Sequence, residues 1–425
     1  FCPYRRLVEV VDRLRFLVNR VRERLWVKPL VSSLLSVGAV FLAKSADYSG
    51  LGELMPVMTQ DSVETLLSVM ASSMLVIATL AVASMVSAYA SASNTATPRS
   101  FRLIIADDVS QNALSIFIGA FIFSIVALTA AKNNYYANAG LFTLFVMTGL
   151  VFVVVVLTFV RWVDRIARLG RIGATIESVE SATEAALRHY REMPRTAHRG
   201  PESDNGIEIT ATAVGYVQHV DLAALQAYAE EQNGSVRVLT LPGTLLMPGR
   251  VMACVSHVSN VDDARVREAF AVGSQRRFDD DPRFGLVVLS EIASRALSPA
   301  VNDPGTGIDI LTRLAGLFQL WCEEPDERSD DAPDYSRVSM PEIAVRDMFD
   351  DAFGAIARDG AGMVEVCQRL QKVLGHLAGS GLADVRDAAI AHQRLALKYA
   401  ESGLVLKEDL ERVRQAGGDS LQEQS

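Results

Sequence analysis

Hydroxyl side chains are concentrated in one long apolar run, from Thr65 to about Ala92, although a lipid-facing helix usually carries few of them. The hydroxyl residues are Ser68, Ser72, Ser73, Thr79, Ser84, Ser87, Ser91 and Ser93. At roughly 100° per helical residue, Ser68, Ser72 and Thr79 fall within about 40° of one another and form one polar sector. Their oxygens can bond across helix interfaces, or they can face water and replace part of an ion's hydration shell.

Two carboxylates, Asp61 and Glu64, come just before this run. In an oligomer that brings several copies of the helix together, they would repeat around an axis and attract cations to the outer mouth of a pore. The alternative is that the hydroxyls only pack helices and the two acids are solvated loop charges. The sequence therefore predicts a cation path lined by Ser68, Ser72 and Thr79, with Asp61 and Glu64 at its mouth.

A second group of polar residues follows a helical stretch that begins near Phe284. Pro299 ends that helix, and Asp303 is placed to cap the next one, with Pro304 at its first position, where a missing N–H costs little. A helix start of this kind can also hold an anion. Capping alone is therefore one interpretation, and a ligand site is the other. The ligand-site residues would be Arg295, Ser298, Asn302, Asp303 and Thr306.

Enzyme and cofactor motifs are absent from the sequence. It has no Walker-type phosphate loop, no GxGxxG after a strand, no HExxH and no GxSxG. Its six histidines show no metal-ligand spacing, and its four cysteines lie far apart, so we expect free thiols and no metal site. The module at residues 201–260 contains no lysine that could carry biotin or lipoate. The prediction is a non-enzymatic protein without a cofactor.

Four runs are long and apolar enough to cross a bilayer, which takes about 20 helical residues. They extend from Trp26 to Ala43, Thr65 to about Ala92, Ala113 to Ala131, and Leu141 to Val160. The chain has 50% hydrophobic and 21% charged residues, and most of the apolar ones are segregated in these runs. The sequence therefore predicts a four-helix transmembrane bundle within residues 26–160.

Arginine and lysine in the short flanks predict the orientation, because such flanks stay on the cytoplasmic side. The segment before the first span is rich in arginine, whereas the connection from Ser45 to Glu64 has no Lys or Arg. Further basic residues follow the second span and the fourth, at Arg99, Arg102, Arg161, Arg165, Arg168 and Arg171. We expect a multi-pass protein of a bacterial inner membrane with both termini in the cytoplasm.

The remaining segments complete the predicted domain organisation. Residues 1–25 form an amphipathic helix at the membrane surface, which either binds anionic lipid headgroups or only sets the topology. Residues 161–200 are a connecting helix, continuous from Arg161 to Glu192, with a linker. Residues 201–260 form a β-rich cytoplasmic module interrupted by a helix from Leu222 to Gln232, residues 261–416 a helical domain, and residues 417–425 a disordered tail. The fold class is a transmembrane bundle with an α+β cytoplasmic region.

The sequence also resembles a family of bacterial predicted membrane proteins of unknown function, with four spans followed by a soluble region. The similarity extends from about the first span to Leu317. After Pro304 that family has a bulkier residue, then Thr and Ala, where this chain has Gly305, Thr306 and Gly307. The resemblance implies the topology and brings no catalytic or binding residues. Its marks are Gly215-Tyr216-Val217-Gln218 with Asp221, Pro242-Gly243 with Gly249, Arg276 with Asp281, Phe284-Gly285, and the run from Arg295 to Pro304, RALSPAVNDP.

These features together predict a homo-oligomeric membrane channel or channel-like transport protein controlled by its cytoplasmic region. The alternative is a membrane-anchored sensor or scaffold whose soluble region binds a ligand or a protein. A formal net charge of -9 argues against a nucleic-acid partner, because binding to phosphates needs clustered basic residues on an exposed face. The predicted partners are the lipid bilayer and further copies of the chain.

Overall fold

The fold is known from a computed structural model. The residues that it describes are 26–48, 56, 58–95, 97–100, 103, 108–166, 171–192, 206–258, 260–323 and 335–418. By their contacts they divide into two compact units, one with the residues up to Thr175 and one with the residues from Ile176 onward. The predicted amphipathic helix at residues 1–25, residues 419–425 of the predicted tail, and most of the acidic stretch from Glu323 to Asp334 lie outside the described residues.

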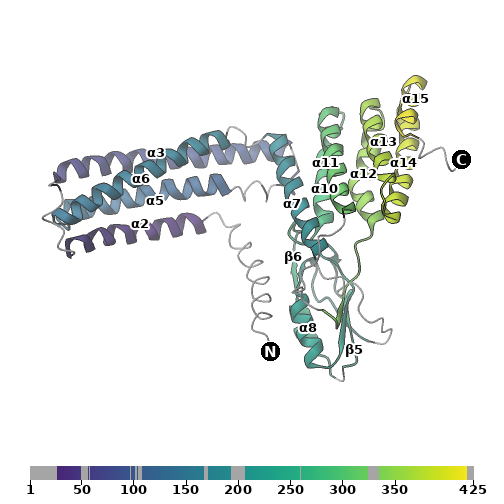
Figure 1. Ribbon diagram of the computed structural model, residues 1–425, viewed down its shortest axis with the longest axis horizontal. Helices are drawn as coiled ribbons and strands as arrows, with labels where there is room; N and C mark the ends of the chain where they lie inside the picture. The colour runs from purple at the N-terminus through teal and green to yellow at the C-terminus, as the bar shows by residue number, and fades with distance from the viewer. Residues whose placement is uncertain are drawn as a thin grey trace. The chain divides into compact units, whose positions relative to one another are not determined.

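The first unit is a bundle of four long apolar helices, drawn in purple and blue in Figure 1. The helices are α2 (Val27–Ser45), α3 (Gln60–Thr95), α5 (Asp108–Lys132) and α6 (Asn138–Ile166), with the short 3-10 turn η1 (Ala46–Tyr48) after α2. Each of the four is long and apolar enough to cross a membrane. The four predicted runs are confirmed, and all the helices extend beyond the predicted ends except at the start of α2.

Small residues let the helices of this bundle approach closely. Gly119 of α5 faces α2, where a Cβ on the glycine would lie 2.2 Å from the Ser32 hydroxyl oxygen and 3.2 Å from that of Ser36. Close backbone approach at Gly and Ser is a usual way of packing helices in lipid, where the hydrophobic effect adds little. The interior that results is mostly apolar, with Leu67 and Phe123 among its fully buried side chains.

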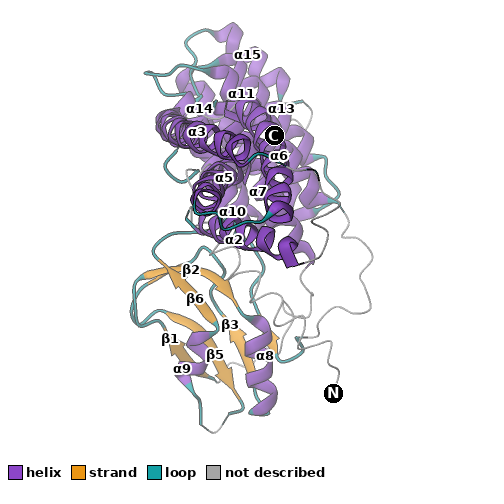
Figure 2. Cartoon of the chain, turned by 90° about the vertical axis from the view of Figure 1, so that its left-hand side faces the viewer, coloured by secondary structure: helices purple, strands orange, loops and turns teal. Residues whose placement is uncertain are grey.

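Two small sheets begin the second unit (Figure 2). One sheet has the order β1-β5-β3-β7 and the other the order β4-β2-β6; all pairs are antiparallel except β3 with β7. The strands are β1 (Ile207–Thr210), β2 (Gly215–Val220), β3 (Ser235–Val238), β4 (Leu245–Leu246), β5 (Val251–Ser256), β6 (Phe270–Gly273) and β7 (Val338–Ser339). The helices beside them are α8 (Leu222–Glu231) and α9 (Asp263–Glu268).

Side chains that alternate between the two faces of a strand form the core of this β module. In β3, Val236 and Val238 point to the core while Ser235 and Arg237 are less buried, as expected of a strand with one covered face. Helix α8 covers that face with Leu225 and other apolar residues. Asp221 caps α8 by accepting a hydrogen bond from Ala224 N at 2.9 Å.

Helices make up the rest of the unit. After α7 (Ile172–Glu192), which precedes the sheets, come α10 (Pro282–Ala296), α11 (Pro304–Cys322), α12 (Val345–Asp359), α13 (Val364–Ala378), α14 (Ala383–Gly403) and α15 (Lys407–Ala416). Phe318, Phe349 and Phe353 pack together in this part, with ring centroids 4.4 to 5.4 Å apart. The predicted fold class, a transmembrane bundle followed by an α+β region, is confirmed.

Two details differ from the sequence-based expectation. The sheets extend past residue 260, since β6 completes one sheet and β7, which follows two helices, pairs in parallel with β3. Pairing between segments so distant in sequence leaves no local pattern. The helix expected to be continuous from Arg161 to Glu192 is instead two, because α6 ends at Ile166 and Arg171 is not helical. Gly170 and Gly173 weaken helix propensity at this point.

Candidate functional site

The predicted pore residues lie on the outward surface of the single-chain bundle. Ser68, Ser72 and Thr79 are exposed, and the opposite face of α3 is buried against the other helices. That buried face is apolar and consists of Val63, Leu67, Met70, Ala71, Met74, Ala78, Ala81, Met85 and Ala88. The hydroxyls therefore do not join α3 to its neighbours within one chain.

The hydroxyls of Ser72 and Thr79 donate hydrogen bonds to backbone carbonyls of their own helix. Ser72 Oγ donates to Ser68 O at 3.0 Å, and Thr79 Oγ1 donates to Leu75 O at 2.8 Å. A hydroxyl bonded in this way keeps its lone pairs free to accept a further hydrogen bond or to contact a cation. The face thus combines these hydroxyls with exposed aliphatic side chains such as Val76, and it is available to lipid, to water or to another chain.

The two predicted mouth residues belong to the beginning of α3, with Asp61 in its first turn, where the sequence suggested a loop. Asp61 is exposed, and a carboxylate near a helix N-terminus is favoured by the helix dipole. Glu64 is half-buried and accepts a hydrogen bond from Gln60 Nε2 at 2.8 Å; the same amide donates to Ala131 O at the end of α5. Both acids lie at the same end of α3, and Ser68 follows Glu64 by one helical turn.

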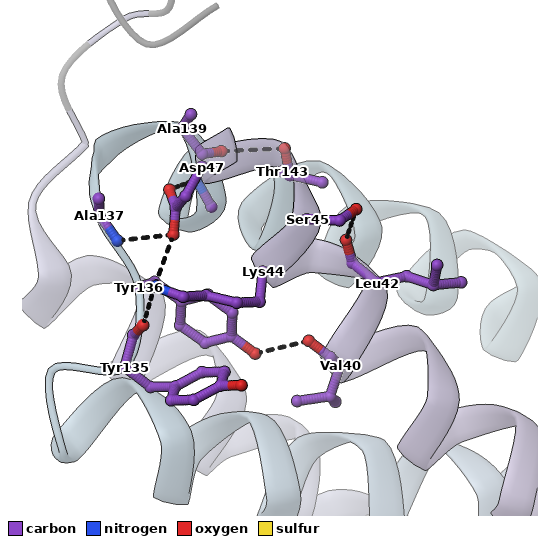
Figure 3. Close-up of polar contacts among 11 residues, drawn as sticks. Val40, Leu42, Lys44, Ser45, Asp47, Tyr135, Tyr136, Ala137, Ala139 and Thr143 are labelled. Carbon is purple, nitrogen blue, oxygen red and sulfur yellow. Dashed lines mark hydrogen bonds and ion pairs between the residues drawn. The ribbon is translucent and has the colours of Figure 1, made fainter. Parts of the chain in front are cut away.

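A polar clasp, which the sequence reasoning missed, joins the end of α2 to the start of α6 (Figure 3). Asp47 accepts hydrogen bonds from Ala137 N at 2.9 Å and Gly140 N at 2.6 Å, so its carboxylate binds the free N–H groups of α6. Lys44 Nζ lies 3.1 Å from the Asp47 carboxylate and donates to Tyr135 O at 2.6 Å. The signal in the sequence is one Lys and one Asp at the end of an apolar run.

The clasp also fixes two aromatic rings. Tyr136 donates a hydrogen bond to Val40 O at 2.9 Å, and Lys44 Nζ lies 5.1 Å from the centre of the Tyr135 ring. Gly140 is required beside it, because a Cβ there would lie 2.7 Å from the Asp47 carboxylate. Asp47 and Lys44 both bond to groups of the bundle itself. The clasp is therefore a structural link between spans.

The loop between α10 and α11 has the geometry of a helix cap. Asp303 accepts from Thr306 N at 3.1 Å and from Thr306 Oγ1 at 2.6 Å, and Pro304 is the first helical residue. Asn302 has a positive φ of 52°, which lets Asp303 N reach back to Ala296 O at 2.8 Å. Ser298 Oγ donates to Arg295 O at 2.7 Å. The predicted ligand residues thus come together in one turn, and the bonds among them are those of helix termination.

Replacing Asp303 with Ala is expected to reduce the free energy of unfolding by about 0.5 to 2 kcal/mol, the usual value of an N-cap. The Thr306 hydroxyl and backbone N–H hold the pKa of Asp303 below its ordinary value. A lowered pKa means that this stabilisation is present at neutral pH and is lost as the pH falls below about 4. Urea unfolding of the variant and the wild type at pH 7 and pH 3.5 measures both effects, and an equal midpoint at pH 7 would contradict the cap.

A buried ion pair lies where α10 begins. Arg276 donates to both carboxylate oxygens of Asp281, at 2.7 and 2.9 Å, and its guanidinium lies 5.2 Å from the centre of the Phe284 ring. Asp281 also caps α10 through Phe284 N at 3.1 Å. Gly243, with φ +89°, packs so close that a Cβ would lie 2.2 Å from the Asp281 carboxylate. Four residues that mark the family resemblance therefore meet in one place.

Burial is the largest influence on this carboxyl group. It raises the pKa of Asp281, while the hydrogen bonds and the charge of Arg276 act in the opposite direction. The pair is therefore a case in which the arginine offsets the cost of taking a carboxylate out of water. The group of residues is enclosed and mutually satisfied, so its arrangement serves to hold β2, the turn at Gly243 and α10 together.

Comparison with known proteins agrees with this architecture. A family model described as "Predicted membrane protein (DUF2254)" matches residues 22–376. "Uncharacterized protein MT1328" and "Uncharacterized protein Rv1290c", from two strains of Mycobacterium tuberculosis, are each 27% identical over 136 residues. That alignment covers 30% of this chain and 26% of each relative, so the chain matches about a quarter of the relatives' length. No solved structure matches. Because the family model covers most of the chain, this protein belongs to that family of predicted multi-pass membrane proteins.

Proposed function

We propose that the protein is a homo-oligomeric channel, or a channel-like transporter, that conducts cations along the outward face of α3. The observation that carries the proposal is the contrast between outward surfaces. Those of α2 and α6 present mainly large aliphatic side chains such as Leu34 and Leu150, whereas that of α3 carries Ser68, Ser72 and Thr79 among its exposed aliphatic side chains. Aliphatic faces suit lipid, and a hydroxyl face suits water or another helix.

An oligomer is part of the proposal because one chain offers no path. The described interior of the single bundle is closely packed and mostly apolar. A path lined by the α3 hydroxyls therefore forms only where several copies bring this helix to a common axis. Asp61 and Glu64 would then form a repeated ring of carboxylates at one end, whose attraction for cations weakens as salt screens it.

Cation flux into liposomes that contain the purified protein tests this proposal. Flux should fall strongly when Ser72 and Thr79 are both changed to Leu, because the hydration sites along the path are then lost. Neutralising Asp61 and Glu64 to Asn and Gln should reduce flux at low salt and have less effect at high salt.

The control for bulk is Val153→Leu on the outward face of α6, which should leave the flux unchanged. Flux that is selective for anions, or that is the same in the Ser72 and Thr79 variant, would refute the pore. A protein that forms no oligomer in mild detergent or lipid would refute it independently.

We infer the orientation from the basic flanks: a bacterial inner membrane with both termini in the cytoplasm. Reporter fusions after Ser49 and Asn138 should give an external signal, and fusions after Arg99 and Arg171 an internal one. An external signal after Arg171 would overturn this arrangement and would place the C-terminal region outside.

A membrane-anchored sensor or scaffold is the second candidate. The mostly apolar interior of the single bundle favours it, because a purely anchoring bundle needs only tight packing. In that case the α3 face would serve association alone, and the liposomes would carry no flux although the protein remained oligomeric.

A further inference from the structure

Two histidines from different elements share one carboxylate in the C-terminal unit. His219 Nδ1 of β2 lies 2.6 Å from Asp280 Oδ2, and His189 Nε2 of α7 lies 3.6 Å from Asp280 Oδ1. All three side chains are partly buried; that of Asp280 is 12% exposed. Asp280 lies in the loop between β6 and α10. Neither the proposed channel face nor the helix cap at Asp303 uses these residues.

The charged groups around this cluster already have partners of their own. On the loop, Arg276 pairs with Asp281 and Arg277 with Asp279. On α7, Arg188 pairs with Glu184, one turn away.

Two further charged residues of α7, Arg191 and Glu192, follow His189 within one helical turn. Arg191 of α7 donates to Leu320 O at 2.5 Å. On β2, the neutral Gln218 donates to Gln275 O at 2.7 Å. The carboxylate of Asp280 is thus the anion nearest to both imidazoles among the described groups.

The cluster contacts α7 near its C-terminal end, at His189. Farther back, Thr183 packs directly against Gly285 of α10, and Glu180 forms an ion pair with Arg313 of α11. Near His189, the Tyr190 ring stacks on Trp321 with centroids 5.7 Å apart. Helix α7 is therefore fixed to the helical part along its length, and the link from His189 through Asp280 to His219 ties its last turns to the β module.

We propose that His189, His219 and Asp280 form a proton-responsive clasp between α7 and the β module. An imidazole is the side chain whose charge ordinarily changes between about pH 5 and 8. With both rings neutral the cluster holds one negative charge, and with both protonated it holds two positive charges beside one carboxylate. A hydrogen bond between a protonated imidazole and a carboxylate is stronger than one with a neutral ring.

Proton binding to the imidazoles and closure of the clasp are thermodynamically linked. A protonated imidazole bonds the Asp280 carboxylate more strongly than a neutral one, so acidification favours the closed state over one in which α7 has separated from Asp280. The clasp is tighter at pH 6 than at pH 8. It is a property of the C-terminal unit and holds whether or not the chain conducts ions; in a channel it would supply a regulatory input.

Hydrogen exchange of the full chain in mild detergent, at pH 6 and pH 8 and corrected for the intrinsic exchange rate, tests the clasp. Protection of the amides in residues 184–192 and in β2 should be about two- to fivefold greater at pH 6, the size expected of a partly buried ion pair. The double variant His189→Gln and His219→Gln should lose this difference, as should Asp280→Asn.

Two histidines outside the cluster serve as controls. His376→Gln, an exposed residue of α13, should retain the difference. His392 of α14 pairs with Asp350 of α12, away from α7, so replacing His392 should leave the protection of residues 184–192 unchanged. Equal protection of the wild type at both pH values would overturn the proposal, and so would a difference that persists in the double variant. Neither result depends on ion flux.

Discussion

Changing Arg276 to Ala should reduce the free energy of unfolding of the C-terminal unit by about 3 to 5 kcal/mol, the range for breaking a buried ion pair from one side. The Asp281 carboxylate is 4% exposed and would remain in place without its charged partner. The variant also loses the contact of the guanidinium with the Phe284 ring.

The dependence on pH distinguishes this loss from a simple packing defect. Burial already raises the pKa of Asp281, and removal of Arg276 raises it further, since the arginine favours the ionised form. A raised pKa lets the buried carboxyl take up a proton in the folded state at a higher pH. The cost of the substitution is therefore largest near neutral pH and shrinks as the pH falls.

Fluorescence of Trp321 provides the measurement. The chain has three tryptophans, so Trp26→Phe and Trp162→Phe leave Trp321, which stacks on Tyr190, as the reporter of the C-terminal unit. Urea unfolding is then compared for Arg276→Ala and for the control Arg412→Ala, whose exposed side chain pairs with Asp409 on α15 and whose loss should change little. Equal losses in the two variants, or a loss that does not vary with pH, would be evidence against the buried-pair account.

Local patterns predicted much of this fold. The four spans follow from runs of apolar residues, and the helix from Leu222 was expected because a run of helix formers lies between two strand-like segments. The cap at Asp303 was likewise predictable, since an acidic residue followed by Pro at N1 is a local signal. In each case the determining interactions lie within a few residues.

Contacts between distant segments were not predictable in the same way. Strand β7 has two residues, and its pairing with β3 depends on about a hundred residues of intervening chain folding first. The clasp at Asp47 joins residues about ninety positions apart, and the cluster around Asp280 joins three elements. The spacing of residues along the chain does not predict such long-range contacts. The outward position of Ser68 was also open, since periodicity defines a sector and not what the sector faces.

Changing Gly285 to Ala should destabilise the C-terminal unit by about 1 to 3 kcal/mol, although Ala is a better helix former than Gly. A Cβ at this position would lie 1.9 Å from Thr183 Oγ1 and 2.7 Å from Thr183 Cβ. Thr183 is fully buried, and its hydroxyl donates to Val179 O, so it has no open direction in which to move. Helices α7 and α10 must therefore separate.

Gly316→Ala on α11 is the matched control, because Gly316 is also inside a helix but a Cβ added there would meet no neighbouring atom within 4 Å. It should stabilise the unit by up to about 1 kcal/mol through helix propensity alone. Opposite signs for the two substitutions in the Trp321 assay would establish that the close approach of α7 to α10 is the cause. Adding Thr183→Ala to Gly285→Ala should restore only part of the loss, since the Cβ of residue 183 still lies too close. Full recovery, or stabilisation by Gly285→Ala itself, would mean that α7 is not packed on α10 at Gly285.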